Sequence, residues 1–164
     1  YDEGVETLGP SIEAVKDSTF PNNHIIMVLA YEARGGELME ATAKELHKKY
    51  KGFFKDFLLV KHPENLPGEV IGKGPNLTYA GETVAEYVKK THLPVENIIV
   101  TSLDSDNRMA PKYLDAVAYE FVTHPNRQRL SYQPVSLFMN NIWDAPAPSR
   151  VVATSNSFFN IISN

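Results

Sequence analysis

Two aspartates separated by one residue and a lysine between two glycines are the side chains of this sequence best suited to chemistry. Asp104 and Asp106 follow an apolar run, and Lys73 lies between Gly72 and Gly74. Carboxylate oxygens are preferred ligands of Mg²⁺ and Mn²⁺. A lysine in a glycine-rich turn that begins a helix can approach an anion closely. Together the motifs predict a site where a divalent cation and a diphosphate meet.

The aspartate pair taken alone allows other interpretations. A calcium loop of the EF-hand type is excluded, because Arg108 and Met109 stand where an oxygen ligand and a glycine are required. A HAD-like phosphohydrolase, with Asp104 as the nucleophile and Asp106 as the acid, stays open, although Arg108 replaces the threonine or valine usual there. The acids can also cap the following helix, with Asp106 or Asn107 at the N-cap.

The lysine-bearing turn is also ambiguous by itself. Gly68 and Gly72 are too close together for a Walker loop, and no strand precedes the turn closely enough for a dinucleotide-binding loop. A plain turn is the simpler interpretation of Gly72, Lys73 and Gly74. A phosphate contact is favoured only where this turn lies beside the two aspartates.

The elements that must position these motifs follow from strand and helix patterns along the chain. Apolar runs predict buried strands at residues 24–31, 57–61 and 98–103, with a weaker candidate at 130–135. Helical spacing predicts a first helix that begins or kinks at Pro10, and further helices at 37–50, 75–90, 111–122 and 149–162. Because strands and helices alternate with no hairpin signal, we expect an α/β fold with a mostly parallel sheet and flanking helices.

In an open parallel sheet, ligands bind outside the carboxyl ends of the strands. Residues 32–36, 72–76 and 104–106 all fall at such ends if residues 98–103 form a strand. We therefore expect Lys73 and Asp106 to lie within reach of one small ligand.

Composition narrows the class of protein. The chain has 164 residues, of which 43% are hydrophobic, and this length predicts a single domain over residues 1–164. The net charge of −4 argues against a nucleic-acid or anionic-membrane surface. The absence of cysteine excludes disulfides and thiolate chemistry and fits a reducing compartment, so a cytoplasmic location is expected. No apolar run approaches the roughly 20 residues needed to span a bilayer.

Histidines and the single tryptophan are the other conspicuous side chains. The five histidines lack the spacing of metal ligands, so we expect them on the surface or in loops. Trp143 lies in a proline-rich segment and is expected either to stack on a sugar or, more simply, to pack beneath that segment.

The order of the motifs resembles the donor-binding half of family 2 glycosyltransferases, whose nucleotide-sugar-binding, Rossmann-like fold is called GT-A. The matching features are YDE at residues 1–3, GKGPN at 72–76 and LDSD at 103–106. The resemblance covers nearly the whole chain. It is closest to bacterial members with the run HPENLPGEVIGKGPN, then a D-x-D, then the QP of residues 133–134 and the NNIW of 140–143.

The resemblance implies roles for individual residues in binding the donor. Tyr1 and Glu3 would lie by the nucleobase and ribose, and Glu32 would stand near the acid that reads the base. Lys73 would face the diphosphate. Tyr31 and Glu32 replace the usual pair of aspartates at that strand end, so base recognition is the part of the site that departs from the family pattern.

The same resemblance implies a divalent metal, Mg²⁺ or Mn²⁺, as the cofactor. Asp106 would be the main metal ligand. Asp104 would lie against the ribose and diphosphate and also bind the metal.

The activity implied by the resemblance is an inverting, hexosyltransferase-type transfer. A sugar would pass from a nucleotide-sugar donor to a saccharide or lipid-linked acceptor, without nucleic acid. The family's first strand would precede Tyr1 and its catalytic base would follow Asn164. We therefore expect a truncated domain that contains no catalytic residue and is inactive alone, with any membrane association, at the cytoplasmic face, made by other parts of the parent protein. A non-catalytic nucleotide-sugar binding module stays open as an alternative.

The absence of the family's first strand would affect whether chains associate with one another. It would leave a sheet edge unpaired, and unpaired edges promote association between chains. Self-association of this chain is therefore expected.

Overall fold

Two parallel strands, β1 (Ile26–Glu32) and β2 (Asp56–His62), form the centre around which the first helices of the chain pack. The strands are paired along their whole length, from Ile26 opposite Asp56 to Glu32 opposite His62. The apolar runs at the start of the chain therefore form strands within two residues of the predicted ends.

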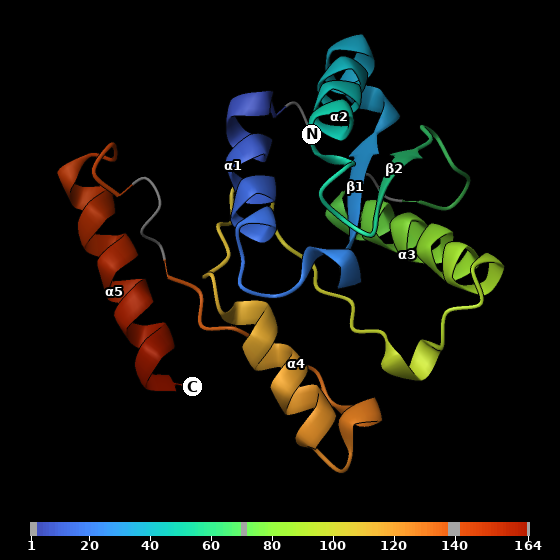
Figure 1. Cartoon of the computed structure of the whole chain (residues 1–164). Helices are drawn as coiled ribbons and strands as arrows, with labels where there is room; N and C mark the ends of the chain where they lie inside the picture. The colour runs from blue at the N-terminus through green and yellow to red at the C-terminus, as the bar shows by residue number, and fades with distance from the viewer. Residues whose placement is uncertain (1–2, 70–71, 138–141, 164) are drawn as a thin grey trace. The chain divides into compact units, whose positions relative to one another are not determined.

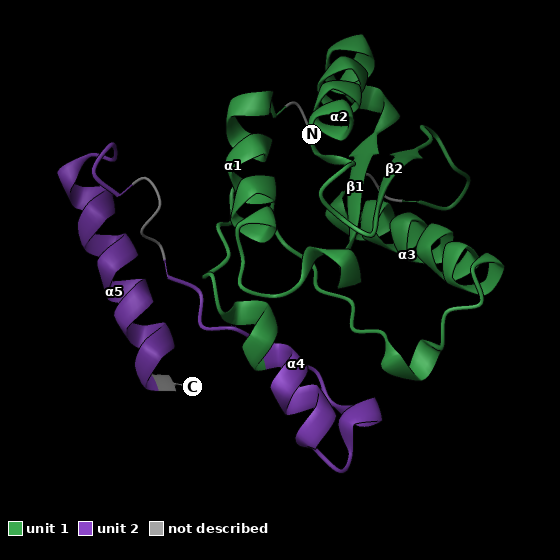
Figure 2. Cartoon of the chain, in the orientation of Figure 1, with its two compact units in different colours: residues 1–116 green, residues 117–164 purple. Residues whose placement is uncertain are grey.

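The computed structural model describes residues 3–69, 72–137 and 142–163. The chain divides into two compact units, Tyr1–Ala116 and Val117–Asn164 (Figure 2). The first unit contains both strands. Helix α4 (Tyr113–Thr123) crosses the boundary between the units.

Helices make up most of the rest of the chain (Figure 1). Those of the first unit are α1 (Val5–Lys16), α2 (Gly36–Tyr50) and α3 (Lys73–Lys90), and the second unit contains α5 (Ala147–Ser163). Short 3-10 turns lie at Asn22–His24, Ala33–Gly35, Val95–Asn97 and Arg127–Arg129. None of the helices in the described ranges is long and apolar enough to cross a membrane.

The two faces of the strand pair are covered by different helices. Alternate residues of a strand point to opposite faces. Phe57 belongs to the apolar core shared by α1, α2 and β1, and its ring meets His47 of α2. His62, on the other face, meets Tyr79 of α3. The first unit is therefore an α/β arrangement with helices flanking a parallel sheet, as the sequence predicts.

Two predicted strands are wrong. Residues 98–103 and 130–135 form no strand, although Ile98 and Leu130 are individually extended. Val100 is 79% exposed, so the run is not buried either. β-branched residues favour an extended backbone, but a strand also needs a neighbour to receive its hydrogen bonds. In the described residues neither run pairs with β1 or β2.

The helices begin earlier than the prolines suggest. Helix α1 starts at Val5 and contains Pro10 in its interior, and α3 starts at Lys73, two residues before Pro75. A proline in the first turn costs no hydrogen bond, because the N–H it lacks would have no partner inside the helix. Lys73 is therefore the first residue of α3 rather than part of a loop.

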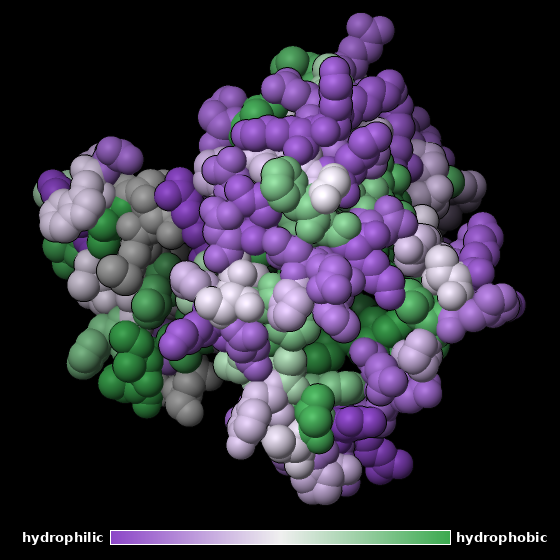
Figure 3. Space-filling view, in the orientation of Figure 1, coloured by the Kyte–Doolittle hydropathy of each residue, from purple (hydrophilic) through white to green (hydrophobic). Residues whose placement is uncertain are grey.

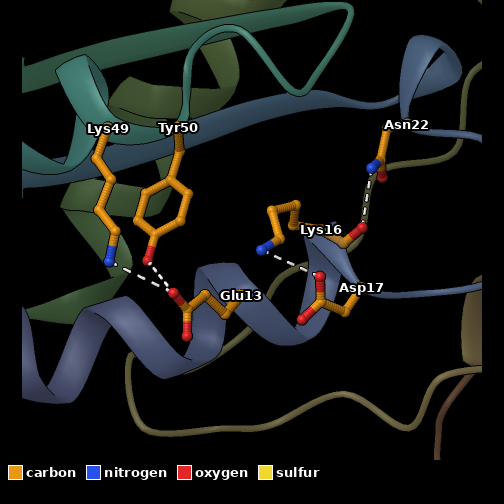
Figure 4. A network of polar contacts seen from close by, with 6 residues as sticks. All are labelled: Glu13, Lys16, Asp17, Asn22, Lys49 and Tyr50. Atoms are coloured by element: carbon orange, nitrogen blue, oxygen red, sulfur yellow. Dashed lines mark hydrogen bonds and ion pairs between the residues drawn. The ribbon is translucent and has the colours of Figure 1, made fainter.

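Polar contacts join α1 to α2 beside the core (Figure 4). The hydroxyl of Tyr50 donates a hydrogen bond of 2.8 Å to Glu13, and Lys49 lies 3.4 Å from the same carboxylate. These donors hold the pKa of Glu13 below its usual value, with Tyr50 as the largest cause. Beyond the end of α1, Asn22 donates to the backbone oxygen of Lys16 at 2.8 Å.

A second ion-pair network links α2 to β2 and predicts a pH dependence of stability. Glu40 accepts hydrogen bonds from Lys44, at 2.6 Å, and from Lys61, which lower its pKa from 4.5 to about 2. Because the pKa is depressed in the folded state, the stabilisation is present above pH 4.5 and is lost as the pH falls toward 2. We expect Glu40→Gln to lose less stability than the parent over this interval, measured by urea denaturation at several pH values. Identical pH profiles would contradict the assignment.

Helix α5 of the second unit carries an exposed apolar face. Val151, Phe158 and Ile162 lie on one face at helical spacing, and all three are exposed. Ser157 on the opposite side is buried, and Asn160 donates to the backbone oxygen of Ser136 at 3.0 Å. Figure 3 shows hydrophobic residues gathered where Figure 1 places α5. Exposed apolar surface favours association, so the expected self-association, which stays a prediction, has a second physical cause.

Candidate functional site

The lysine and the first aspartate singled out from the sequence are in direct contact. The ammonium of Lys73, at the start of α3, donates a hydrogen bond to Oδ1 of Asp104 and forms an ion pair with it. The two residues are 31 positions apart in the sequence. Both side chains face solvent, with exposed fractions of 62% and 53%. They therefore form one charged surface patch that a ligand can reach.

The aspartate-bearing turn is held in place by two anchors rather than by a strand. The backbone N–H of Asn107 donates to the backbone carbonyl oxygen of Asp104 at 3.0 Å, and this hydrogen bond closes the turn. Ser11 of α1 donates to the backbone oxygen of Ser105 at 2.6 Å, and Met109 is buried in the apolar core. These contacts fix the backbone on both sides of Asp106. Ser11 is not among the site residues predicted from the sequence. The sequence feature that could have pointed to it is its position as a small polar residue beside the apolar stripe of α1.

Asp106 is exposed in the same turn as Asp104. Both aspartates offer carboxylate oxygens, which are the ligands that a hard cation takes. Among the residues that the structure describes, no three or more His, Cys, Asp or Glu side chains converge as a complete metal site. Any cation held here would therefore need ligands of other kinds besides these two carboxylates.

Glu32 ends β1 as expected, but its carboxylate is engaged. Arg34 forms an ion pair with Glu32 through Nε and donates a second hydrogen bond through Nη2 at 3.1 Å. The short 3-10 turn after β1 brings this arginine back onto the strand end. Arg34 therefore occupies one acceptor position on each oxygen of the Glu32 carboxylate.

His62 at the end of β2 contradicts the expectation that the histidines are surface or loop residues. It is buried, because it lies on the sheet face that α3 covers, with its ring 5.1 Å from the ring of Tyr79. Its Nε2 lies 3.0 Å from Glu69 Oε2 without the alignment of a hydrogen bond. Glu69 belongs to the loop that leads toward Lys73, and Gly68 gives that loop its turn with a φ of +83°. The loop that carries Glu69 thus lies against His62 at the end of β2.

The structure joins part of the predicted site and leaves the rest apart. Tyr1 lies outside the described residues, as does the NN of the NNIW segment. Glu3 precedes α1. Within the described residues, neither Glu3 nor Glu32 forms a hydrogen bond or ion pair with Lys73 or Asp104. The contact between Lys73 and Asp104 is the part of the site that the structure assembles.

Trp143 does not pack beneath the proline-rich segment. Its side chain is 83% exposed, and the guanidinium of Arg150 lies 5.9 Å from the centre of its ring. The simpler of its two predicted interpretations is therefore wrong, because the described residues around Trp143 leave most of its side chain exposed.

Comparison with known proteins assigns this chain to no family, so its class is argued from the fold and the site alone. No protein family, curated protein or solved structure matches the chain. What the fold and geometry define is an α/β unit with an exposed acid–lysine patch beside the start of a helix.

Proposed function

We propose that the first unit binds the diphosphate of a nucleotide sugar together with Mg²⁺ or Mn²⁺, as the donor-binding part of a glycosyltransferase similar to family 2. The observation that supports this most directly is the contact between Lys73 and Asp104. It sets a group that binds phosphate beside a group that binds a cation. The α/β arrangement with helices flanking parallel strands is compatible with the GT-A fold, which forms part of the proposal.

The carboxylates of Asp104 and Asp106 suit such a cation. Mg²⁺ is commonly held by one or two carboxylates, with substrate phosphates and water as its other ligands. A site with few protein ligands can therefore bind the cation when phosphates and water complete its coordination. When bound, the cation would neutralise charge that develops on the departing nucleoside diphosphate.

The chain's own residues then have separate tasks. Lys73 orients the diphosphate, with support from the positive end of the α3 dipole. Tyr1, Glu3 and Glu32 contact the nucleobase and ribose. The acceptor is a saccharide or lipid-linked hydroxyl. A cytoplasmic location, or the cytoplasmic face of a membrane for the parent, belongs to the same proposal.

The Lys73–Asp104 patch also favours a second candidate function, phosphate-ester hydrolysis. A phosphohydrolase that uses Asp104 as its nucleophile would gain from an ammonium beside it, because Lys73 would attract the phosphate group. In that case, hydrolysis of p-nitrophenyl phosphate should occur and should be abolished by Asp104→Asn.

Isothermal titration with UDP-sugars and GDP-sugars tests the main proposal. We expect binding that requires Mn²⁺ and that weakens by about tenfold or more in Asp106→Ala, which corresponds to the loss of about 1.4 kcal/mol. Asp17→Ala is the matched control, because Asp17 is an exposed acid of the same unit that pairs with Lys16 at 3.1 Å. If no nucleotide binds, with or without metal, the proposal is wrong and a purely structural domain is favoured.

A further inference from the structure

His62 is a buried titratable side chain to which the proposed function gives no role. Its side chain is only 9% exposed, and its Nε2 atom is buried without a hydrogen-bond partner. Oε2 of Glu69 lies 3.0 Å from this nitrogen, outside the alignment of a hydrogen bond. Buried polar atoms normally have a partner. Protonation of the imidazole would create one, because a positively charged N–H beside a carboxylate forms a charge-assisted hydrogen bond.

The carboxylate of Glu69 is the charge that is available to His62. Glu32 lies opposite His62 in the strand register, but it is paired with Arg34. The charged and titratable groups around His62 are Glu69 of the loop, Glu32 of β1 with its partner Arg34, Tyr79 of α3, and the neighbouring Lys61 of β2 with its partner Glu40. Among the described residues, Glu69 forms no ion pair other than the one with His62.

The loop that carries Glu69, residues 63–69, has few other contacts that would hold it in place. Most of its residues are exposed, and only Pro63 and Leu66 are half-buried. Among the described residues, its backbone hydrogen bond runs from Glu69 to Leu66 and stays inside the loop. Segments with few buried contacts open locally at little cost. The contact with His62 can therefore decide whether this loop stays on the end of β2.

We propose that His62 and Glu69 form a pH-dependent tether, which holds residues 63–69 against the end of β2 at acidic pH and releases them as the pH rises. Imidazole is the side chain that ordinarily changes its charge between about pH 5 and about pH 8. When charged, it donates to Glu69 and attracts it. When neutral, it offers no charge attraction, so the loop loses its link to the sheet. The tether is independent of the proposed function, because neither residue is assigned to donor binding.

Hydrogen exchange of the backbone amides in residues 64–69 tests the tether. It is measured by mass spectrometry between about pH 5 and about pH 8 and corrected for the intrinsic pH dependence of exchange. We expect the protection of this loop in the parent protein to fall by about fivefold or more across the interval. That is the size expected for a hydrogen bond between charged groups of which one is partly exposed.

Two variants remove the tether from either side. Glu69→Gln keeps the size of the side chain and removes its charge, so the loop should show at acidic pH the low protection that the parent shows at high pH. His62→Gln cannot titrate and should also lose the pH dependence. His92→Asn is the matched control, because His92 is an exposed histidine of the same unit, and asparagine tolerates its φ of +54°. It should keep the profile of the parent.

The outcomes decide the matter even if one variant is unstable. Glu69 lies on an exposed loop, so Glu69→Gln should fold whether or not the buried His62→Gln does. Equal protection of the parent loop at both ends of the pH interval would overturn the tether. So would a pH dependence that persists in Glu69→Gln, since another group would then be responsible. Loss of the dependence in Glu69→Gln but not in His92→Asn supports the tether.

Discussion

Replacing Tyr50 by alanine is expected to lower the free energy of unfolding by about 3–5 kcal/mol, the range found when large buried aromatic side chains are truncated. Tyr50 is 1% exposed and is among the largest fully buried side chains. It ends α2 and reaches across to α1, so its loss would open a cavity between both helices. Because small domains are stable by only about 5–15 kcal/mol, the variant should unfold at much lower urea concentration, followed by circular dichroism.

Tyr50→Phe is the matched control for this experiment. It keeps the ring in the core and removes only the hydroxyl that donates to Glu13. We expect a much smaller loss of stability and a rise in the pKa of Glu13, since Tyr50 is the largest cause of its depression. Equal losses in the two variants would show that the polar contact, rather than packing, joins α1 to α2.

Reversing the charge of Lys73 is expected to have the largest effect on ligand binding. Lys73→Glu removes the ammonium that faces the phosphates and adds a carboxylate next to Asp104. Hydrogen bonds to charged groups are worth about 1.5–3 kcal/mol, and the added repulsion increases the loss. Binding of UDP with Mn²⁺, measured by titration calorimetry, should therefore weaken by about a hundredfold.

The same variant should bind Mn²⁺ alone more tightly than the parent does, because three carboxylates would then surround the cation. Lys90→Glu applies the same charge reversal at the opposite end of α3, where the native pair is with Glu86. It should leave UDP binding unchanged. A similar loss in Lys90→Glu would mean that overall charge, and not the position of Lys73, controls the affinity.

The charged patch is built from side chains whose backbones are held by different means. Lys73 is carried by the first turn of a helix that packs on the sheet. Asp104 is carried by an exposed turn whose position depends on a serine of α1 and on a buried methionine. The site therefore depends on the packing of α1 even though no residue of that helix is expected to touch the ligand.

Local patterns in the sequence are sufficient to predict most of the regular elements. The apolar runs before Glu32 and Lys61 predict β1 and β2, and amphipathic spacing predicts α2 and α3 to within a few residues. These predictions succeed because the period of the apolar residues matches the period of the element that buries them. The residue types suited to binding a cation and a phosphate are likewise recognisable from the order of the residues alone.

The order of residues therefore sets the conformation that each segment favours and the side chains that the segment offers. Packing between distant segments explains why residues 98–103 pair with no strand of the described chain, why His62 is buried beneath α3 and why Lys73 meets Asp104. The physical reason is that strand pairing, burial and ion pairs need two segments to meet. That meeting depends on how the helices pack across the sheet, which no local spacing of residues encodes.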